Sequence, residues 1–302
     1  MPLAVRPAGQ TGIELSALGY GCSAFWAKSY FDEAAAIRLV HEAHGQGVTY
    51  FDTGASYGNG EAERRLGRAL KEMSASDVVI STKAGTVVGD NGLYKDFSAE
   101  NMKRSLEGSL ARLQLEQVDI LYLHGPQVPD LTDELIASLL GFKTAGLVRA
   151  IGVNSFDNDV LEYCLELPLD GVMLEYNILN QASLDVANAL YGSGKFVVCG
   201  TPIAQAVFSN NLFRLTSLSR VWYLLRTLKN HRAAMLKGRK FSFLNDDDRY
   251  TAAQLALAFV LRQPCFSSAV FGTTRIEHLL DNIKAASMEL PEDILARIEV
   301  VS

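Results

Sequence analysis

Short apolar segments rich in β-branched and aromatic residues alternate with longer segments of helical periodicity along this 302-residue chain. Such alternation is typical of parallel α/β folds, in which each helix returns the chain to the start of the next strand. The expected strands are residues 15–21, 48–52, 78–82, 119–123, 148–153, 172–175, 196–199 and 268–271. Helices are expected from Ser98 onward and over residues 61–73, 132–145, 157–166, 184–191 and 251–261.

Eight strands in a chain of this length predict a single-domain (β/α)8 barrel, the TIM-barrel fold. A doubly wound open sheet is the alternative. Polar residues follow many of the strands, which favours the barrel because a barrel builds its site at those strand ends. We expect residues 9–13 in a short hairpin before the first strand, and residues 205–250 as a long insert after the seventh.

Composition excludes several classes of protein. With 48% hydrophobic and 21% charged residues, the chain can bury a large core. Its net charge of −6 argues against a nucleic-acid partner. The N-terminus lacks the apolar region of a signal peptide, and no apolar stretch reaches the ~20 residues that span a bilayer, so no membrane partner is expected. The four cysteines are scattered without a CxxC pair, which predicts reduced thiols and a cytoplasmic location.

Ionisable residues stand at the ends of three successive strands. Asp52, Lys83 and His124 each end or follow an apolar strand, and Tyr57 comes five residues after Asp52. In a barrel these strand ends meet on one face. Each residue alone has an ordinary structural explanation, as a cap, a solvated lysine or a buried imidazole. Their recurrence at successive strand ends favours a common site.

The chemistry of this set is coherent. A tyrosine with its ordinary pKa of about 10 is a weak acid at neutral pH, and a nearby lysine cation favours the phenolate. A buried lysine needs a carboxylate partner to stay charged, which Asp52 can provide. A histidine N–H can hold a carbonyl oxygen and stabilise its developing charge. These groups suit protonation of an oxygen while a cofactor delivers hydride to carbon.

Two glycine-containing motifs indicate competing functions. GYGCSA at 19–24 matches a dinucleotide-binding pattern, but it lacks a helix directly after it and an acidic residue about twenty positions on. GASYG at 54–58 matches the nucleophile elbow of serine hydrolases, with Ser56 as nucleophile. Residues 52–53 before this motif and 59–60 after it argue against the tight strand–turn–helix that an elbow requires.

Six motifs, in order, resemble those of the aldo-keto reductase family: FDTGASYG (51–58, with Glu61), ISTK (80–83), DILYLH (119–124), GLVRAIGV (146–153), EYN (175–177) and GTT (272–274, with Asn282). The resemblance covers residues 11–286. It implies a (β/α)8 barrel, bound NAD or NADP and reversible carbonyl reduction. It makes Tyr57 the general acid/base, Lys83 and Asp52 its tuning pair, and His124 the group that orients the carbonyl. The implied cofactor contacts are Asp52, Asn154, Ser155, Thr201, Ile203, Gln205, Gly272, Thr273, Thr274, Arg275, His278 and Asn282.

The chain departs from the family pattern near the implied nicotinamide site. The order Asn154-Ser155 reverses the usual Ser-Asn, and Met173 stands where a glutamine is usual. Gly200 replaces a tyrosine that commonly stacks on the ring. The segment 200–204 resembles the branch of L-galactose and D-threo-aldose dehydrogenases, which implies sugar oxidation as one direction.

The choice between NADP and NAD stays open at this point. Gly272 and His278 stand where many NADPH-preferring members have a lysine and an arginine, which weakens a 2′-phosphate site. Arg275 is a replacement cation, because a guanidinium pairs well with phosphate. The turn before the following helix is also suited to hold an anion.

Other features are weaker indications of function. Residues 214–240 contain eight Arg or Lys and no Asp or Glu, which is typical of a solvated amphipathic helix and also suits contact with an anionic cofactor or substrate. His41 and His44 have helical spacing but no third ligand, so no metal site is expected. Trp26, Tyr94 and Trp222 are candidate pocket walls.

We therefore expect an NAD(P)-dependent oxidoreductase acting on a small carbonyl or sugar. A serine hydrolase using Ser56 and a non-catalytic nucleotide-sensing barrel are the alternatives, and substrate and oligomeric state stay open.

Overall fold

The computed structural model describes residues 3–203 and 240–301. Its centre is a closed barrel in the order β3-β4-β5-β8-β9-β10-β11-β12, and β12 pairs with β3 to close the ring. Every neighbouring pair in the ring is parallel. The strands are β3 (Leu18–Gly21), β4 (Tyr50–Asp52), β5 (Val79–Ala84), β8 (Val118–His124), β9 (Val148–Asn154), β10 (Gly171–Leu174), β11 (Phe196–Cys199) and β12 (Ser268–Phe271). The predicted (β/α)8 barrel is confirmed.

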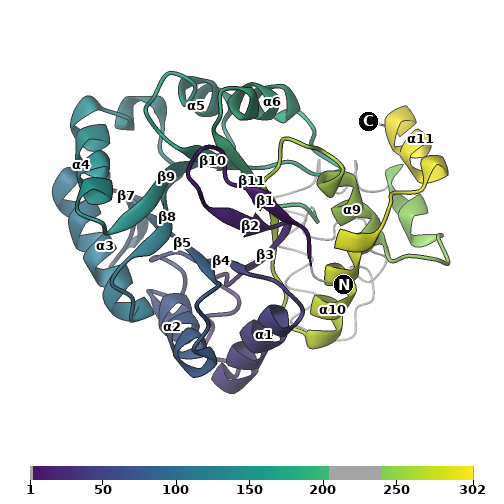
Figure 1. Ribbon diagram of the computed structural model, residues 1–302, viewed down its shortest axis with the longest axis horizontal. Coiled ribbons are helices and arrows are strands. Elements are labelled where there is room, and N and C mark those ends of the chain that lie inside the picture. The colour runs from purple at the N-terminus through teal and green to yellow at the C-terminus, as the bar shows by residue number, and fades with distance from the viewer. Residues whose placement is uncertain (1–2, 204–239, 302) are drawn as a thin grey trace.

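Helices surround this ring, as Figure 1 shows in a view along the barrel. They are α1 (Glu33–Gly45), α2 (Glu61–Met73), α3 (Ala99–Leu113), α4 (Asp133–Thr144), α5 (Asn158–Tyr163), α6 (Leu184–Gly192), α9 (Ala252–Leu261), α10 (Ile276–Lys284) and α11 (Glu292–Val301). Several begin at caps that are visible in the sequence. Ser98 caps α3, Thr132 caps α4, and Thr251 forms a capping box with Gln254 at the start of α9.

Two hairpins lie outside the ring. β1 (Val5–Pro7) pairs with β2 (Glu14–Ser16), and residues 9–13 form the turn between them, as predicted. The expected strand 15–21 is wrong at its start, because residues 14–16 belong to this hairpin and the barrel strand begins only at Leu18. The second hairpin, β6 (Thr86–Gly89) with β7 (Gly92–Lys95), follows β5 and was not predicted.

The barrel interior is a packed core. Side chains from the strands, among them Tyr50, Tyr122, Met173 and Phe196, form one buried cluster with Ile13 and other residues of the first hairpin. The hairpin lies across the near end of the barrel in Figure 1 and closes that end. In barrels of this kind the functional site is built at the other end, where the strands have their carboxyl ends.

Glycine at position 19 is explained by this packing. A Cβ built there would lie 2.6 Å from the Tyr50 ring. The residues after β3 form turns, and no helix starts there before Glu33. Gly19 therefore belongs to the barrel wall, and the structure gives the GYGCSA motif no phosphate-binding turn.

The helices of the described ranges include none that is both long and apolar enough to cross a membrane. All four cysteines are buried and free. Most of the expected insert, including Gln205, the basic residues from Arg214 to Arg239 and Trp222, lies outside the described residues.

Candidate active site

The four predicted catalytic residues lie at one end of the barrel. Asp52 ends β4, Lys83 is the fifth residue of β5, and His124 ends β8. These three strands are adjacent and parallel, so their ends meet on the same face. Tyr57 lies in the turn between β4 and α2, with its backbone N–H donating to the Gly54 carbonyl at 3.0 Å.

Lys83 and Asp52 form a buried ion pair. Lys83 is 2% and Asp52 5% exposed, and the Lys83 ammonium donates to Asp52 Oδ2 and to the Thr53 carbonyl, the latter at 2.8 Å. Burial alone would lower the pKa of Lys83, but the negative charge of Asp52, followed by Tyr57, raises it above its ordinary value. Lys83 is therefore a permanent cation under physiological conditions.

The Tyr57 ring lies close to both this cation and the His124 imidazole. Lys83 Nζ is 5.1 Å from the centre of the Tyr57 ring. The His124 ring meets the Tyr57 ring edge to face, with 5.8 Å between ring centres and 89° between planes. The phenol ring is thus near both a charged donor and an imidazole ring.

His124 is neutral in this environment. Burial, and then the nearby Lys83 and Lys95 cations, lower its pKa to about 3. A neutral imidazole has one N–H donor and one acceptor nitrogen. Its Nδ1 atom is buried and has no hydrogen-bond partner among the described residues.

A chain of buried hydroxyls supports Asp52 from below. Ser81 Oγ donates to Asp52 Oδ1 at 2.7 Å, Tyr50 and Ser81 hydroxyls are 3.0 Å apart, and the Tyr50 and Tyr122 hydroxyls are 3.2 Å apart. Burial raises the pKa of both tyrosines, so they stay neutral. Sequence reasoning missed these partners. Ser81 lies two residues before Lys83 and so on the same side of β5, which is the one signal that pointed to it.

Glu63 fixes the helix that follows Tyr57. Its side chain is fully buried, accepts from Thr82 Oγ1 at 2.5 Å and accepts from Arg112 Nε at 2.6 Å. These bonds join α2, β5 and α3. Because Thr82 precedes Lys83 in β5, the same network holds the strand that carries Lys83 against α2, the helix that follows the Tyr57 turn.

The predicted cofactor residues of β9 and β11 face the same end of the barrel. Asn154 ends β9 and donates through Nδ2 to the Met173 carbonyl at 3.3 Å, and the adjacent Ser155 is also buried. Thr201 follows β11, and its Oγ1 is buried without a partner among the described residues. Ile203 packs against the core, while Gln205 lies outside the described part of the chain.

The loop after β12 carries the remaining cofactor candidates. Tyr20 donates to the Thr273 carbonyl at 2.6 Å, and the Arg275 backbone N–H donates to Thr273 Oγ1 at 3.2 Å. Arg275 precedes α10, and its guanidinium is 3.5 Å from the Glu277 carboxylate. Gly272, Thr274 and His278 lie in the same stretch, and Asn282 is buried further along α10. A phosphate that used Arg275 would therefore compete with Glu277.

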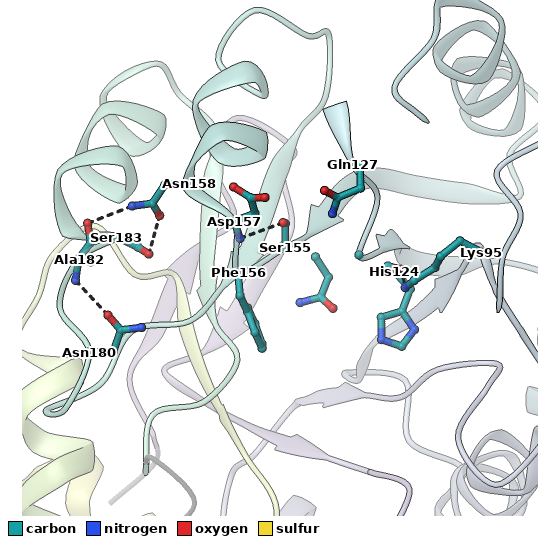
Figure 2. A pocket seen from close by; sticks show the side chains of 12 residues that line it. Lys95, His124, Gln127, Ser155, Phe156, Asp157, Asn158, Asn180, Ala182 and Ser183 are labelled. Atoms are coloured by element: carbon teal, nitrogen blue, oxygen red, sulfur yellow. Dashed lines mark hydrogen bonds between the residues drawn. The ribbon is translucent and has the colours of Figure 1, made fainter. Parts of the chain in front are cut away.

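A pocket of about 720 Å³ opens beside His124. Figure 2 shows Lys95 and His124 on one side of it, with Asp157, Asn158 and Ser183 on the other. Sequence reasoning placed His124, Asn154 and Ser155 here and missed the others. The remaining lining residues are Gly125, Gln127, Phe156, Asn180 and Ala182. Neither Trp26, which is buried in the core, nor Tyr94, which is exposed on β7, lines it.

The competing assignments gain no support from the described residues. Ser56 lies in the turn after β4, and no hydrogen bond joins it to a histidine in the ranges that the structure covers. His41 Nε2 lies 3.1 Å from the Ala69 carbonyl, and His44 pairs with Asp77 at 2.9 Å. No group of three or more metal-ligating side chains is found within residues 3–203 and 240–301.

Comparison with known proteins shows which family the chain belongs to. A model of the aldo/keto reductase family matches residues 17–302. The chain belongs to the aldo/keto reductase family. It is 30% identical to NADH-specific methylglyoxal reductase of Escherichia coli, covering 95% of this chain and 94% of the relative. It is 28% identical to L-galactose dehydrogenase of Arabidopsis thaliana (98% and 93%) and 30% identical to D-threo-aldose 1-dehydrogenase of a Pseudomonas species (96% and 95%).

Among solved structures, the chain resembles the holo form of the aldo-keto reductase AKR11C1 from Bacillus halodurans. The TM-score is 0.83 at 25% identity, over 99% of this chain and 96% of the other. The likeness to sugar dehydrogenases agrees with the branch expected from residues 200–204. This aldo/keto reductase is an NAD(P)-dependent oxidoreductase of carbonyl compounds.

Proposed function

We propose that this aldo/keto reductase interconverts a small carbonyl compound or sugar and the corresponding alcohol, with Tyr57 as the general acid/base. The observation that carries the proposal is the proximity of the Tyr57 ring to both the Lys83 cation, 5.1 Å from the ring centre, and the neutral His124 ring, 5.8 Å between ring centres. The relatives named for galactose, aldose and methylglyoxal chemistry support the substrate class.

The cofactor supplies a hydride to the carbonyl carbon when it is bound. In that direction the Tyr57 hydroxyl gives its proton to the carbonyl oxygen, and in the reverse direction the phenolate takes the alcohol proton. The Lys83 ammonium stabilises the phenolate. Asp52 keeps Lys83 charged through their buried ion pair.

His124 orients the substrate. Since its imidazole is neutral, it offers an N–H to the carbonyl oxygen without adding a full charge to the site. A donor aimed at this oxygen favours the state in which negative charge develops there.

The residues present fit a nicotinamide cofactor. Thr201 Oγ1 is a buried hydroxyl without a hydrogen-bond partner in the part of the chain that the structure describes. Gly272 leaves space that a Cβ, 3.2 Å from the Gly21 carbonyl, would narrow. Asn154, Ser155, Thr201 and the 272–282 segment would hold the group. A fluorescence titration with NADPH and then NADH tests this fit and decides which of the two is preferred.

The experiment on function compares wild type, Tyr57→Phe and Ser56→Ala in steady-state assays and in the same titration. We expect Tyr57→Phe to lose turnover by about 100-fold or more while it keeps cofactor affinity. Ser56→Ala is the neighbouring control and should retain turnover. Full activity of Tyr57→Phe would refute the proposal, and ester hydrolysis that depends on Ser56 would replace it with the hydrolase. Cofactor binding without turnover of any carbonyl or sugar would indicate a nucleotide sensor.

A further inference from the structure

Lys95 is a second lysine next to the catalytic histidine. It is the last residue of β7 and pairs with Thr86 across the hairpin. Its ammonium donates to Thr86 Oγ1 at 2.8 Å and to the backbone carbonyl of His124. The same pocket therefore contains the Lys95 ammonium and the His124 imidazole, side by side along one wall in Figure 2.

The position of this ammonium depends on Gly125. A Cβ built at Gly125 would lie 2.9 Å from Lys95 Nζ. Gly125 also has a φ of +65°, which disfavours any side chain there. The chain thus leaves open the space that the ammonium occupies at the rim of the pocket.

The charge of Lys95 is not neutralised by a neighbouring carboxylate. Within the described residues no acidic side chain comes within ion-pair distance of it, and its two acceptors are a hydroxyl and a carbonyl. Asp130 acts on it only at longer range, and its carboxylate accepts from the Gln127 backbone N–H at 2.8 Å. Asp157 lies across the pocket and accepts from the Asp159 backbone N–H at 3.0 Å.

An ammonium has three N–H donors, and two of those of Lys95 are used within the protein. We propose that Lys95 binds an anionic group of the substrate, a carboxylate or a phosphate monoester, while the carbonyl of the same molecule lies at His124 and Tyr57. This inference rests on the proposed function and specifies its substrate class: short carbonyl compounds and sugars that carry an anion.

Matched substrate pairs test this inference. The pairs are D-glucuronate with D-glucose, for a carboxylate, and glyceraldehyde 3-phosphate with glyceraldehyde, for a phosphate. The measured quantity is kcat/KM for the anionic member divided by kcat/KM for its neutral counterpart. We expect this ratio to exceed one in the wild type for at least one pair, which also tells which anion is preferred.

Lys95→Met removes the charge and keeps the chain length, while Lys95→Arg keeps the charge. Lys71→Met, on the outer surface of α2, removes the same charge away from the pocket. Lys95→Met should lower the ratio by about fivefold for a carboxylate and by more for a phosphate. The change should come chiefly from a lower kcat/KM for the anionic substrate. Lys95→Arg should retain most of the preference, and Lys71→Met should leave it unchanged. Thermal unfolding of each variant checks that the fold is intact.

A binding measurement separates this inference from the proposed function. Calorimetric titration of the cofactor-loaded protein with glycerol 3-phosphate and with glycerol needs no turnover. Weaker binding of glycerol 3-phosphate to Lys95→Met than to wild type supports the anion site even if the assays find no reaction. Turnover of the neutral substrates with equal ratios in wild type and Lys95→Met overturns the Lys95 inference and leaves the proposed function standing. Absence of binding of glycerol 3-phosphate to the wild type, with no anionic preference in either pair, also overturns it.

Discussion

Replacing His124 by asparagine should make the protein more resistant to mild acid. In the folded protein burial, and then the Lys83 and Lys95 cations, lower the pKa of His124 to about 3. In the unfolded chain the imidazole has its ordinary pKa of about 6.5. Between these two values only the unfolded state binds the proton, so the free energy of unfolding falls as the pH falls. This contribution begins near pH 6.5 and is complete near pH 3.

The magnitude follows from the two pKa values. At pH 7 the unfolded imidazole is mostly neutral and the cost is small. At pH 5 the unfolded imidazole is almost fully protonated, while the folded one is almost fully neutral. A single group with these values lowers the free energy of unfolding by about 2 kcal/mol between pH 7 and pH 5.

Urea unfolding of the cofactor-free protein at pH 7 and at pH 5 measures this effect. The quantity of interest is the pH-dependent change in the wild type minus the change in His124→Asn, since other acid-sensitive groups contribute to both. His278→Asn, at the exposed start of α10, controls for the loss of an imidazole elsewhere. If wild type and His124→Asn lose the same stability between pH 7 and pH 5, the reasoning about the neutral imidazole is wrong.

Three further changes test other parts of the site. Asp52→Asn leaves the buried Lys83 cation without a counter-charge, so we expect kcat to fall by about 100-fold and the free energy of unfolding by about 3 kcal/mol, measured by steady-state assay and urea unfolding. Glu277→Gln frees Arg275 from its exposed partner, so NADPH affinity relative to NADH should rise by about threefold in fluorescence titrations. An unchanged ratio would show that Arg275 does not contact the 2′-phosphate. Gly19→Ala forces a methyl group to within 2.6 Å of a tyrosine ring in the barrel, which should cost about 1–3 kcal/mol of stability in the same unfolding assay, and wild-type stability would contradict the packing argument.

The features that were predictable from the sequence depend on short-range patterns. Apolar strand segments, helical periodicity, the cap Ser98 and the helix starts at Thr132 and Thr251 are all recognised within a few residues of the chain. The gathering of the candidate catalytic residues at one end was predictable because parallel strands bring their ends together in any barrel. The positions of Asp52 and His124 at strand ends were therefore enough to predict that they lie on one face of the barrel.

The features that were missed depend on contacts between distant segments. The β6–β7 hairpin follows a barrel strand where a helix is the usual continuation, and its exposed β7 lacks the apolar alternation of a half-buried strand. Asn180 and Gln127 reach the pocket from loops after different strands, and nothing in their local sequence indicates this. The start of the first barrel strand was wrong because Glu14–Ser16 and Leu18–Gly21 are both extended, and only their pairing partners separate hairpin from barrel.

The distribution of charge links the proposed catalytic site with the proposed anion site. Two lysines, Lys83 and Lys95, act on His124, whereas Asp52 neutralises only one of them. Positive charge therefore lies next to a neutral imidazole, with Asp157 on the opposite side of the same pocket. In the proposed mechanism, this positive charge would favour the negative charge that develops on a carbonyl oxygen and on the Tyr57 phenolate. Lys95 has no carboxylate at ion-pair distance among the described residues, and it lies at the rim of the pocket, where an anionic substituent of a substrate would meet it.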